Sequence, residues 1–194
     1  MSLNKKIDLQ RYKQAIDFSF NFYKKSYRRG IKIPYFVYLT SVSNLIIENN
    51  GNTDEAVAAL FHDIFEFENN TRHLNVIKKR FGTRVFNIIK QCSILEINNN
   101  FFDNKKEFVE SMSKMSQSSL LVSICDKLHS INCIINDHNK IGKKLWKNYY
   151  LSSEETFWYY KNLCKNFKKF LKNHKTLKDR FQRNINELDF LIKK

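Results

Sequence analysis

Glycine and proline are scarce in this chain, which has four Gly and one Pro among 194 residues. Both residues break helices and mark turns, so their scarcity argues against a loop-rich all-β fold and favours long helices. Hydrophobic residues make up 42% and aromatic residues 14% of the chain, as is usual in a globular protein. A chain of this length is long enough to bury a hydrophobic core, so we expect a compact all-α fold.

The sequence also lacks long apolar segments and paired cysteines. No stretch reaches about 18 apolar residues, so we expect no membrane-spanning helix. The first residues, MSLNKKIDLQRYKQ, contain no apolar signal-peptide core, and we expect a cytoplasmic protein. The cysteines form no CxxC pair, so buried free thiols in a reducing compartment are the expected state. They are Cys92, Cys125, Cys133 and Cys164.

Acidic residues are outnumbered, because 34 Lys and Arg face 19 Asp and Glu, which gives a formal net charge of +15. Such a field attracts polyanions, which include nucleotides, nucleic acid and acidic proteins. Solvated faces of basic helices are the plainer interpretation, because charge runs without a fold-level motif carry little information. Nucleic acid therefore stays among the candidate partners.

Helical patterns cover nearly the whole chain. Two capping boxes are expected, Asn52 with Glu55 and Ser152 with Glu155, because each pair places a capping side chain three residues before a glutamate. Residues 28–34 contain Gly and Pro and interrupt the first pattern. We expect helices over 8–27, 36–49, 53–67, 73–80, 83–96, 104–115, 117–137 and 153–173.

Polar side chains interrupt an apolar run at residues 59–66, which read ALFHDIFE. Burying such side chains without partners is costly, so their presence asks for an explanation. At helical spacing His62, Asp63 and Glu66 share one face. His62 and Asp63 would reach a metal beside the helix, and Glu66 would act on a metal-bound water as general base. The alternative is an ordinary helix with a few exposed polar residues.

Another acidic residue, Asp126, lies inside the apolar run of residues 120–135. A buried carboxylate needs a cation or hydrogen-bond donors. A metal shared with His62 and Asp63 across the bundle would satisfy all three side chains. A salt bridge to a lysine is the alternative.

Taken in order, five segments resemble the HD superfamily of metal-dependent phosphohydrolases, and more narrowly the (p)ppGpp hydrolase domain of RelA/SpoT proteins and the small alarmone hydrolases. The resemblance extends over about residues 15–165. Each segment alone is weak evidence for the family, whereas five segments in the same order at similar spacings form a specific match. The segments are RRGIKIPY (28–35), DEAVAALFHDIFE (54–66), RFGTRV (80–85), VSICDKLHSIN (122–132) and FWYY (157–160).

The resemblance implies a compact HD-domain helical bundle, which we expect over residues 1–175, and from the sequence pattern we expect a basic C-terminal helix or tail over 176–194. It implies a divalent metal of the Mn²⁺ type bound by two His and two Asp, of which His62, Asp63 and Asp126 match here. The implied reaction belongs to the stringent response. It is a metal-assisted hydrolysis that removes the 3′-pyrophosphate from guanosine tetra- or pentaphosphate.

The resemblance also assigns roles to charged residues beside the metal. Glu66 stands at the family's catalytic acidic position. Arg28 and Arg29 fall where the family places basic residues against the nucleotide, and guanidinium groups suit base stacking and bidentate phosphate contact. The implied partner is therefore a guanine nucleotide or another phosphorylated small molecule.

Four positions depart from the family pattern. Tyr38 occupies the position of the first metal-binding His, and a phenol with an ordinary pKa of ~10 is a poor replacement for imidazole. Phe67 replaces the second residue of an acidic pair, and Ser130 replaces an Asn that follows Asp126 in the family motif. Tyr23 stands where the family has a His ahead of the basic segment.

Loss of one of four ligands weakens metal binding, since affinity depends on ligand number and geometry. One interpretation is a hydrolase whose three-ligand site is completed by Tyr38, by water or by substrate. Another is a catalytically inactive relative, with metal binding weak or absent, that binds a nucleotide or a protein partner. A third is a basic helical protein that binds nucleic acid. The interleaved Tyr and Lys of residues 158–169 fit the third, but no helix-turn-helix or zinc signature occurs.

Overall fold

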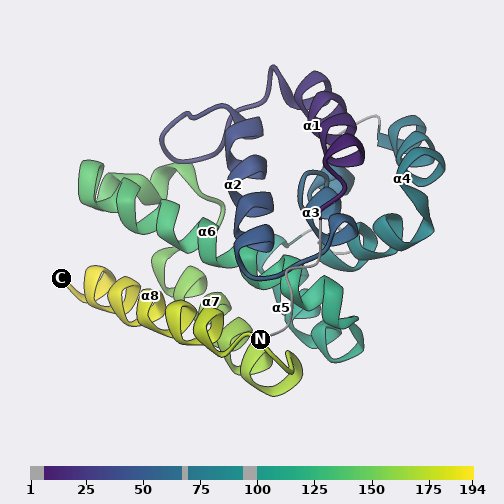
Figure 1. Ribbon diagram of the computed structural model, residues 1–194. Coiled ribbons are helices and arrows are strands. Elements are labelled where there is room, and N and C mark those ends of the chain that lie inside the picture. The colour runs from purple at the N-terminus through teal and green to yellow at the C-terminus, as the bar shows by residue number, and fades with distance from the viewer. Residues whose placement is uncertain (1–6, 67–69, 94–99) are drawn as a thin grey trace.

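The computed structural model describes residues 7–66, 70–93 and 100–194, which form a bundle of helices (Figure 1). The described residues form no strand, apart from one antiparallel bridge between Tyr27 and Pro34, so the expected all-α fold is confirmed. The α-helices are α1 (Leu9–Tyr23), α2 (Tyr35–Glu48), α3 (Thr53–Ala59), α4 (Asn70–Cys92), α5 (Phe101–Ser111), α6 (Gln117–Ile141), α7 (Ser153–Phe170) and α8 (Lys175–Lys193). Short 3-10 helices are η1 (Ile64–Glu66), η2 (Met112–Lys114) and η3 (Gly142–Asn148).

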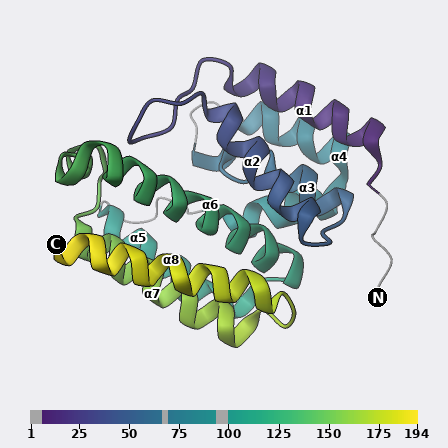
Figure 2. The same cartoon turned by 60° about the vertical axis from the view of Figure 1, so that its left-hand side comes forward.

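Helix α6 is the central element of the bundle. In Figure 2 it crosses the middle of the molecule, with α1 to α4 on one side and α5, α7 and α8 on the other. It contacts α2, α3 and α4 as well as α7 and α8. Residues 119–128 of α6 are buried without a break, which explains the continuous apolar run around Asp126 in the sequence.

Local sequence signals for helix ends are confirmed. The Asn52 side chain accepts a hydrogen bond from the Glu55 amide, the Glu55 carboxylate accepts one from the Asn52 amide, and Ser152 with Glu155 forms the same reciprocal pair. The break expected between two helices at residues 81–82 lies within α4, where Gly82 has φ 90°. This backbone region favours glycine, because it has no Cβ.

Two expected helices end early. The helix expected over residues 53–67 ends at Ala59; residues 60–63 form a turn, and η1 follows. The first helix ends at Tyr23 rather than at residue 27. The prediction that His62, Asp63 and Glu66 share one helix face is therefore wrong, because the chain leaves α3 before His62.

The C-terminal segment forms helix α8, which packs against α6 and α7. Its buried side chains are Leu177, Phe181, Ile185 and Leu188. The expected helix is thus present, while the division of the chain at residue 175 stays a prediction. None of the helices in the described part of the chain combines the length and apolar character needed to cross a membrane. The four cysteines are free thiols, as expected, and Cys133 alone among them is half-buried rather than buried.

Candidate functional site

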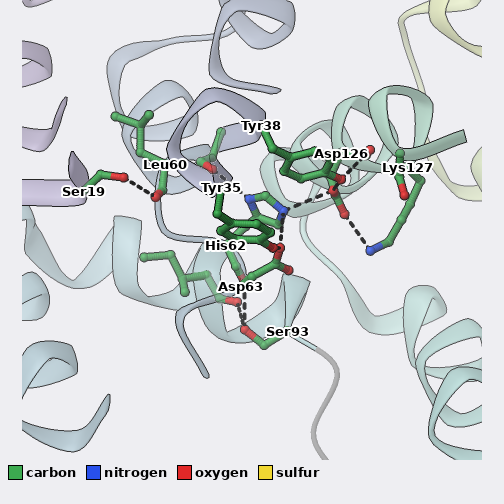
Figure 3. Close-up of polar contacts among 12 residues, drawn as sticks. Ser19, Tyr35, Tyr38, Leu60, His62, Asp63, Ser93, Asp126 and Lys127 are labelled. Carbon is green, nitrogen blue, oxygen red and sulfur yellow. Dashed lines mark hydrogen bonds and ion pairs between the residues drawn. The ribbon is translucent and has the colours of Figure 1, made fainter. Parts of the chain in front are cut away.

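His62 lies in the turn after α3, and hydrogen bonds from other helices hold that turn (Figure 3). The hydroxyl of Ser19 on α1 donates to the Leu60 carbonyl at 3.1 Å, and that of Ser93 donates to the His62 carbonyl at 3.0 Å. These two carbonyls are thereby engaged by side chains instead of continuing the helix. The imidazole Nδ1 donates to the Ala59 carbonyl at 2.7 Å, which leaves Nε2 to face the site.

The structure brings three of the residues singled out in the sequence together. His62 Nε2 lies 3.1 Å from Asp63 Oδ2 and 3.1 Å from Asp126 Oδ1, and all three side chains are buried. Lys127 Nζ lies 2.6 Å from the other oxygen of Asp126. Both partners considered for Asp126 are therefore beside it: the His62–Asp63 pair and a lysine.

Electrostatics couples these four groups. Burial alone would lower the pKa of His62, but the Asp63 and Asp126 carboxylates outweigh it and hold that pKa well above its ordinary value. Burial would raise the pKa of Asp126, but Lys127 and His62 outweigh it and lower that pKa. Two cations and two carboxylates thus balance each other inside the protein.

Two tyrosines of α2 close the site from one side, as Figure 3 shows. The Tyr38 hydroxyl donates a hydrogen bond to Asp126 Oδ1, and the Tyr35 hydroxyl donates one to Asp63 Oδ2. These are the same two oxygens that face His62. The two rings stack with centroids 5.6 Å apart. Burial first, and then the neighbouring carboxylates, raise the pKa of both phenols, so both remain hydrogen-bond donors.

A divalent metal, which the resemblance to HD phosphohydrolases implies, does not fit this arrangement as it stands. Metal ligands must offer lone pairs, from a neutral imidazole and from carboxylate oxygens. Here both inward-facing oxygens, Asp63 Oδ2 and Asp126 Oδ1, already accept hydrogen bonds from the Tyr35 and Tyr38 hydroxyls. No group of three or more His, Cys, Asp or Glu side chains among the described residues is arranged to hold a metal ion.

One observation favours a metal ligand at His62. His62 Nε2 is fully buried, and within the described chain it forms no hydrogen bond of good geometry, although two carboxylates lie 3.1 Å away. A nitrogen placed in this way is also what a metal ligand looks like before the metal arrives. The expectation of Mn²⁺ therefore stays a prediction.

A pocket of about 330 Å³ opens beside this cluster. Its charged and polar lining includes Arg28, Arg29, Glu66, Lys105, Lys127 and Ser130. Glu66 lines this pocket, and burial of its carboxyl group, followed by the charge of Asp63, raises its pKa to about 7. Burial and the charge of Lys127 lower the pKa of Lys105 to about 8. Every site residue expected from the sequence that lies in the described chain borders or supports this pocket.

The loop that carries the two arginines is tied to α6. Asp137 accepts a hydrogen bond from the Arg28 guanidinium at 3.0 Å and one from the Ile31 amide at 3.1 Å. Between them Gly30 has φ 83°, and a side chain there would collide with Asp137. The guanidinium of Arg29 lies 3.8 Å from the centroid of the Tyr150 ring, a cation–π contact.

Sequence reasoning missed Asp137, Lys105 and Lys127 as site residues. A signal for Asp137 exists, because it follows Asp126 by 11 residues, about three helical turns, and so lies on the same face of α6. No comparable signal marks Lys105, which reaches the pocket from α5 only through tertiary packing.

The remaining departures from the family pattern are placed as follows. Ser130 lines the pocket and accepts a hydrogen bond from Tyr160 at 2.8 Å. Tyr23 is fully buried in the core, with its pKa raised by burial. His129, which is not one of these departures, packs against the Tyr38 ring with centroids 4.9 Å apart. Phe67 lies outside the described residues.

Comparison with known proteins supplies the family. The family model of the HD domain matches residues 15–148. The fold is similar to that of a protein described as a metazoan ortholog of SpoT that hydrolyzes ppGpp and plays a role in starvation responses; the TM-score is 0.73 at 15% identity, covering 91% of this chain and 94% of the other. It is also similar to lmo0812 from Listeria monocytogenes EGD-e, with a TM-score of 0.67 at 16% identity, covering 81% and 99%. No curated protein matches the sequence.

At these identities the solved structures establish the fold alone, whereas the family match spans more than half of the chain. The family match covers the segments that carry His62, Asp63 and Asp126, and the structure brings these three buried side chains together. The chain belongs to the HD-domain family and has a SpoT-type hydrolase-like fold.

Proposed function

We propose that this protein binds a phosphorylated guanine nucleotide, of the guanosine 3′,5′-bis(diphosphate) class, in the pocket beside His62. The proposal rests on one observation: cations from three separate segments line a single pocket. Arg28 and Arg29 come from the loop before α2, Lys105 from α5 and Lys127 from α6. The pocket volume of about 330 Å³ falls in the range of small-molecule sites.

The charges that remain available support an anionic ligand. Arg28 is paired with Asp137 and Lys127 with Asp126. Arg29 and Lys105 make no ion pair with any residue in the described chain. Two unpaired cations at one pocket attract a multiply charged phosphate, and Arg29 on its aromatic platform suits a nucleotide.

The test is equilibrium binding of guanosine 3′,5′-bis(diphosphate), with unphosphorylated guanosine as the reference ligand. The account expects the nucleotide to bind and guanosine not to bind. Arg29→Gln removes one charge-assisted contact and should weaken nucleotide binding about tenfold. Lys32→Gln is the matched control, because Lys32 is exposed in the same loop and does not line the pocket. Equal binding of guanosine, or equal losses in both variants, would contradict the proposal.

A second candidate function is hydrolysis of the same nucleotide with release of pyrophosphate. Two observations favour it: the buried Nε2 of His62 without a well-formed hydrogen bond, and Glu66 with a pKa of about 7 at the pocket. A carboxylate with a pKa near neutrality suits the acceptance of a proton from water. The replacement of the family's first metal-binding His by Tyr38 ranks this function below binding.

Pyrophosphate release from the nucleotide, assayed with and without Mn²⁺, decides the second candidate. If hydrolysis occurs, His62→Ala should abolish it. A protein that binds the nucleotide yet releases no pyrophosphate with any divalent metal would eliminate the hydrolase and leave the binding function intact. Nucleic-acid binding stays a prediction from the net charge alone; steep salt dependence on random DNA without nucleotide preference is its signature.

A further inference from the structure

We propose that Lys105 and Lys127, here called the lysine pair, supply the positive charge at the phosphate in place of a metal ion, with Lys105 binding the phosphate and Lys127 neutralising Asp126 beside it, and that Tyr35 and Tyr38 keep the metal position closed. This inference rests on the proposed function, because it states how the same pocket recognises its ligand. The side chains at this position, with Asp63 and Asp126 already bound to tyrosine hydroxyls, do not fit the metal that the family implies.

Two tyrosine hydroxyls occupy the carboxylate oxygens that a metal ion would need. A divalent ion at this position would need Asp63 Oδ2 and Asp126 Oδ1, the two oxygens that converge on His62. Each of these oxygens already accepts a hydrogen bond from a tyrosine hydroxyl of α2. Binding a metal would remove both hydrogen bonds in a buried place, where an unsatisfied hydroxyl is costly. Tyr38 also takes the position at which an imidazole would supply a fourth lone pair.

Lys127 supplies positive charge beside Asp126, at the edge of the pocket. In the family arrangement a metal supplies positive charge next to the scissile phosphate. Here the charge next to Asp126 is Lys127 Nζ at 2.6 Å, and Lys127 lines the pocket. Because Lys127 pairs with Asp126, a phosphate in the pocket meets a compensated carboxylate there.

Lys105 brings a second ammonium group to the pocket. It lines the same pocket from α5 and has no ion pair within the described chain. Its Nζ lies 4.7 Å from the Phe101 ring centroid and 5.2 Å from that of Tyr159. Aromatic faces hold an ammonium group in place without neutralising it. Lys105 is therefore a positioned cation whose charge is free for an incoming anion.

The first experiment measures binding of inorganic pyrophosphate in EDTA, which removes divalent metals. We expect pyrophosphate to bind, and Lys105→Gln to weaken its binding about tenfold or more, as for loss of a charge-assisted contact. Lys106→Gln is the matched control, because this neighbouring lysine pairs with Asp103 and does not line the pocket. Binding that requires a divalent metal, or equal effects of the two variants, overturns the lysine pair.

The second experiment measures Mn²⁺ binding directly, by calorimetric titration without nucleotide. The wild-type protein should bind no stoichiometric Mn²⁺, whereas Tyr38→His, which removes one phenol and adds an imidazole, should gain a site. Stoichiometric Mn²⁺ in the wild type overturns the closed metal position, whatever the variant does. A folded Tyr38→His protein that gains no Mn²⁺ contradicts the role given to Tyr38.

The outcomes separate this inference from the proposed function. Pyrophosphate binding that depends on Lys105, with no preference for the nucleotide, would refute the nucleotide function and support the lysine pair. Nucleotide binding that needs Mn²⁺ and ignores Lys105→Gln would support the function and refute the lysine pair. Absence of binding for both ligands would refute both.

Discussion

At the scale of single residues, Tyr38 contacts Asp126, and its replacement is the most direct test of the proposed site. An imidazole at this position offers a lone pair, whereas the buried phenol keeps its proton and donates a hydrogen bond to Asp126. The surrounding residues remain: His62, Asp63 and Asp126 converge within 3.1 Å contacts. Tyr38 is thus part of a network of hydrogen bonds and ion pairs around these three side chains.

Phosphate binding should depend on pH through two groups at the pocket. The pKa of Glu66 is raised to about 7 and that of Lys105 is lowered to about 8. As pH rises, Glu66 gains negative charge and Lys105 loses positive charge, so both changes oppose an anion. Pyrophosphate itself gains negative charge over this range, so the comparison is made between proteins: relative to Lys105→Gln, the affinity of the wild-type protein for pyrophosphate should fall between about pH 7 and about pH 9. Calorimetry at several pH values measures it.

The control for this prediction is Lys105→Gln, which should flatten the part of the profile near pH 8, the range set by Lys105. An affinity advantage of the wild type over Lys105→Gln that does not shrink as pH rises through about 8 would contradict the assignment of Lys105.

At the scale of elements, the loop of residues 24–34 is positioned by α6. The Arg28–Asp137 ion pair is buried, with side-chain exposures of 9% and 3%, and Asp137 also binds the Ile31 amide. This attachment places Arg29 over Tyr150 at the pocket. The loop is therefore ordered by a contact that spans more than a hundred residues of sequence.

Asp137→Asn should lower the free energy of unfolding by about 3 kcal/mol, because it leaves the buried Arg28 charge without a counter-ion. Urea denaturation measures this loss, and nucleotide affinity should fall with it. Asp17→Asn breaks an exposed pair with Lys13 and should cost about 0.5 kcal/mol or less. Similar losses in the two variants would show that the loop does not depend on Asp137.

Sequence predicted helix starts better than helix ends. The capping boxes at Asn52 and Ser152 were predictable because all their partners lie within three residues. The end of α3 was not, because Ser19 of α1 and Ser93, which directly follows α4, donate hydrogen bonds to the carbonyls of Leu60 and His62. The residues around the end of α3 do not predict those two hydrogen bonds, because both donors are distant in the sequence.

At the scale of the whole molecule, α6 joins two groups of helices and α8 completes the core on its far side. The family, the all-α fold and the His62–Asp63–Asp126 grouping were predictable, since they follow from motif order and apolar patterning. The lysine pair was not, because Lys105 and Lys127 are 22 residues apart and meet only through packing of α5 on the bundle. Pocket charge is a tertiary property.

Helix α8 should be necessary for stability of the bundle. Phe181 is fully buried, so Phe181→Ala should lower the free energy of unfolding by about 4 kcal/mol. Phe190 lies on the same helix with 65% exposure, and Phe190→Ala should change it by no more than about 0.5 kcal/mol. Thermal or urea unfolding measures both. A small effect of Phe181→Ala would show that α8 is dispensable.

The most direct test of the central claim is the dissociation constant for guanosine 3′,5′-bis(diphosphate), measured by calorimetry in EDTA and again in Mn²⁺. Cations from the loop, α5 and α6 line the pocket, and phenols occupy the carboxylate oxygens that a metal would need. The account predicts that the nucleotide binds in EDTA with the same affinity as in Mn²⁺. Binding seen only in Mn²⁺, or none in either, would contradict it.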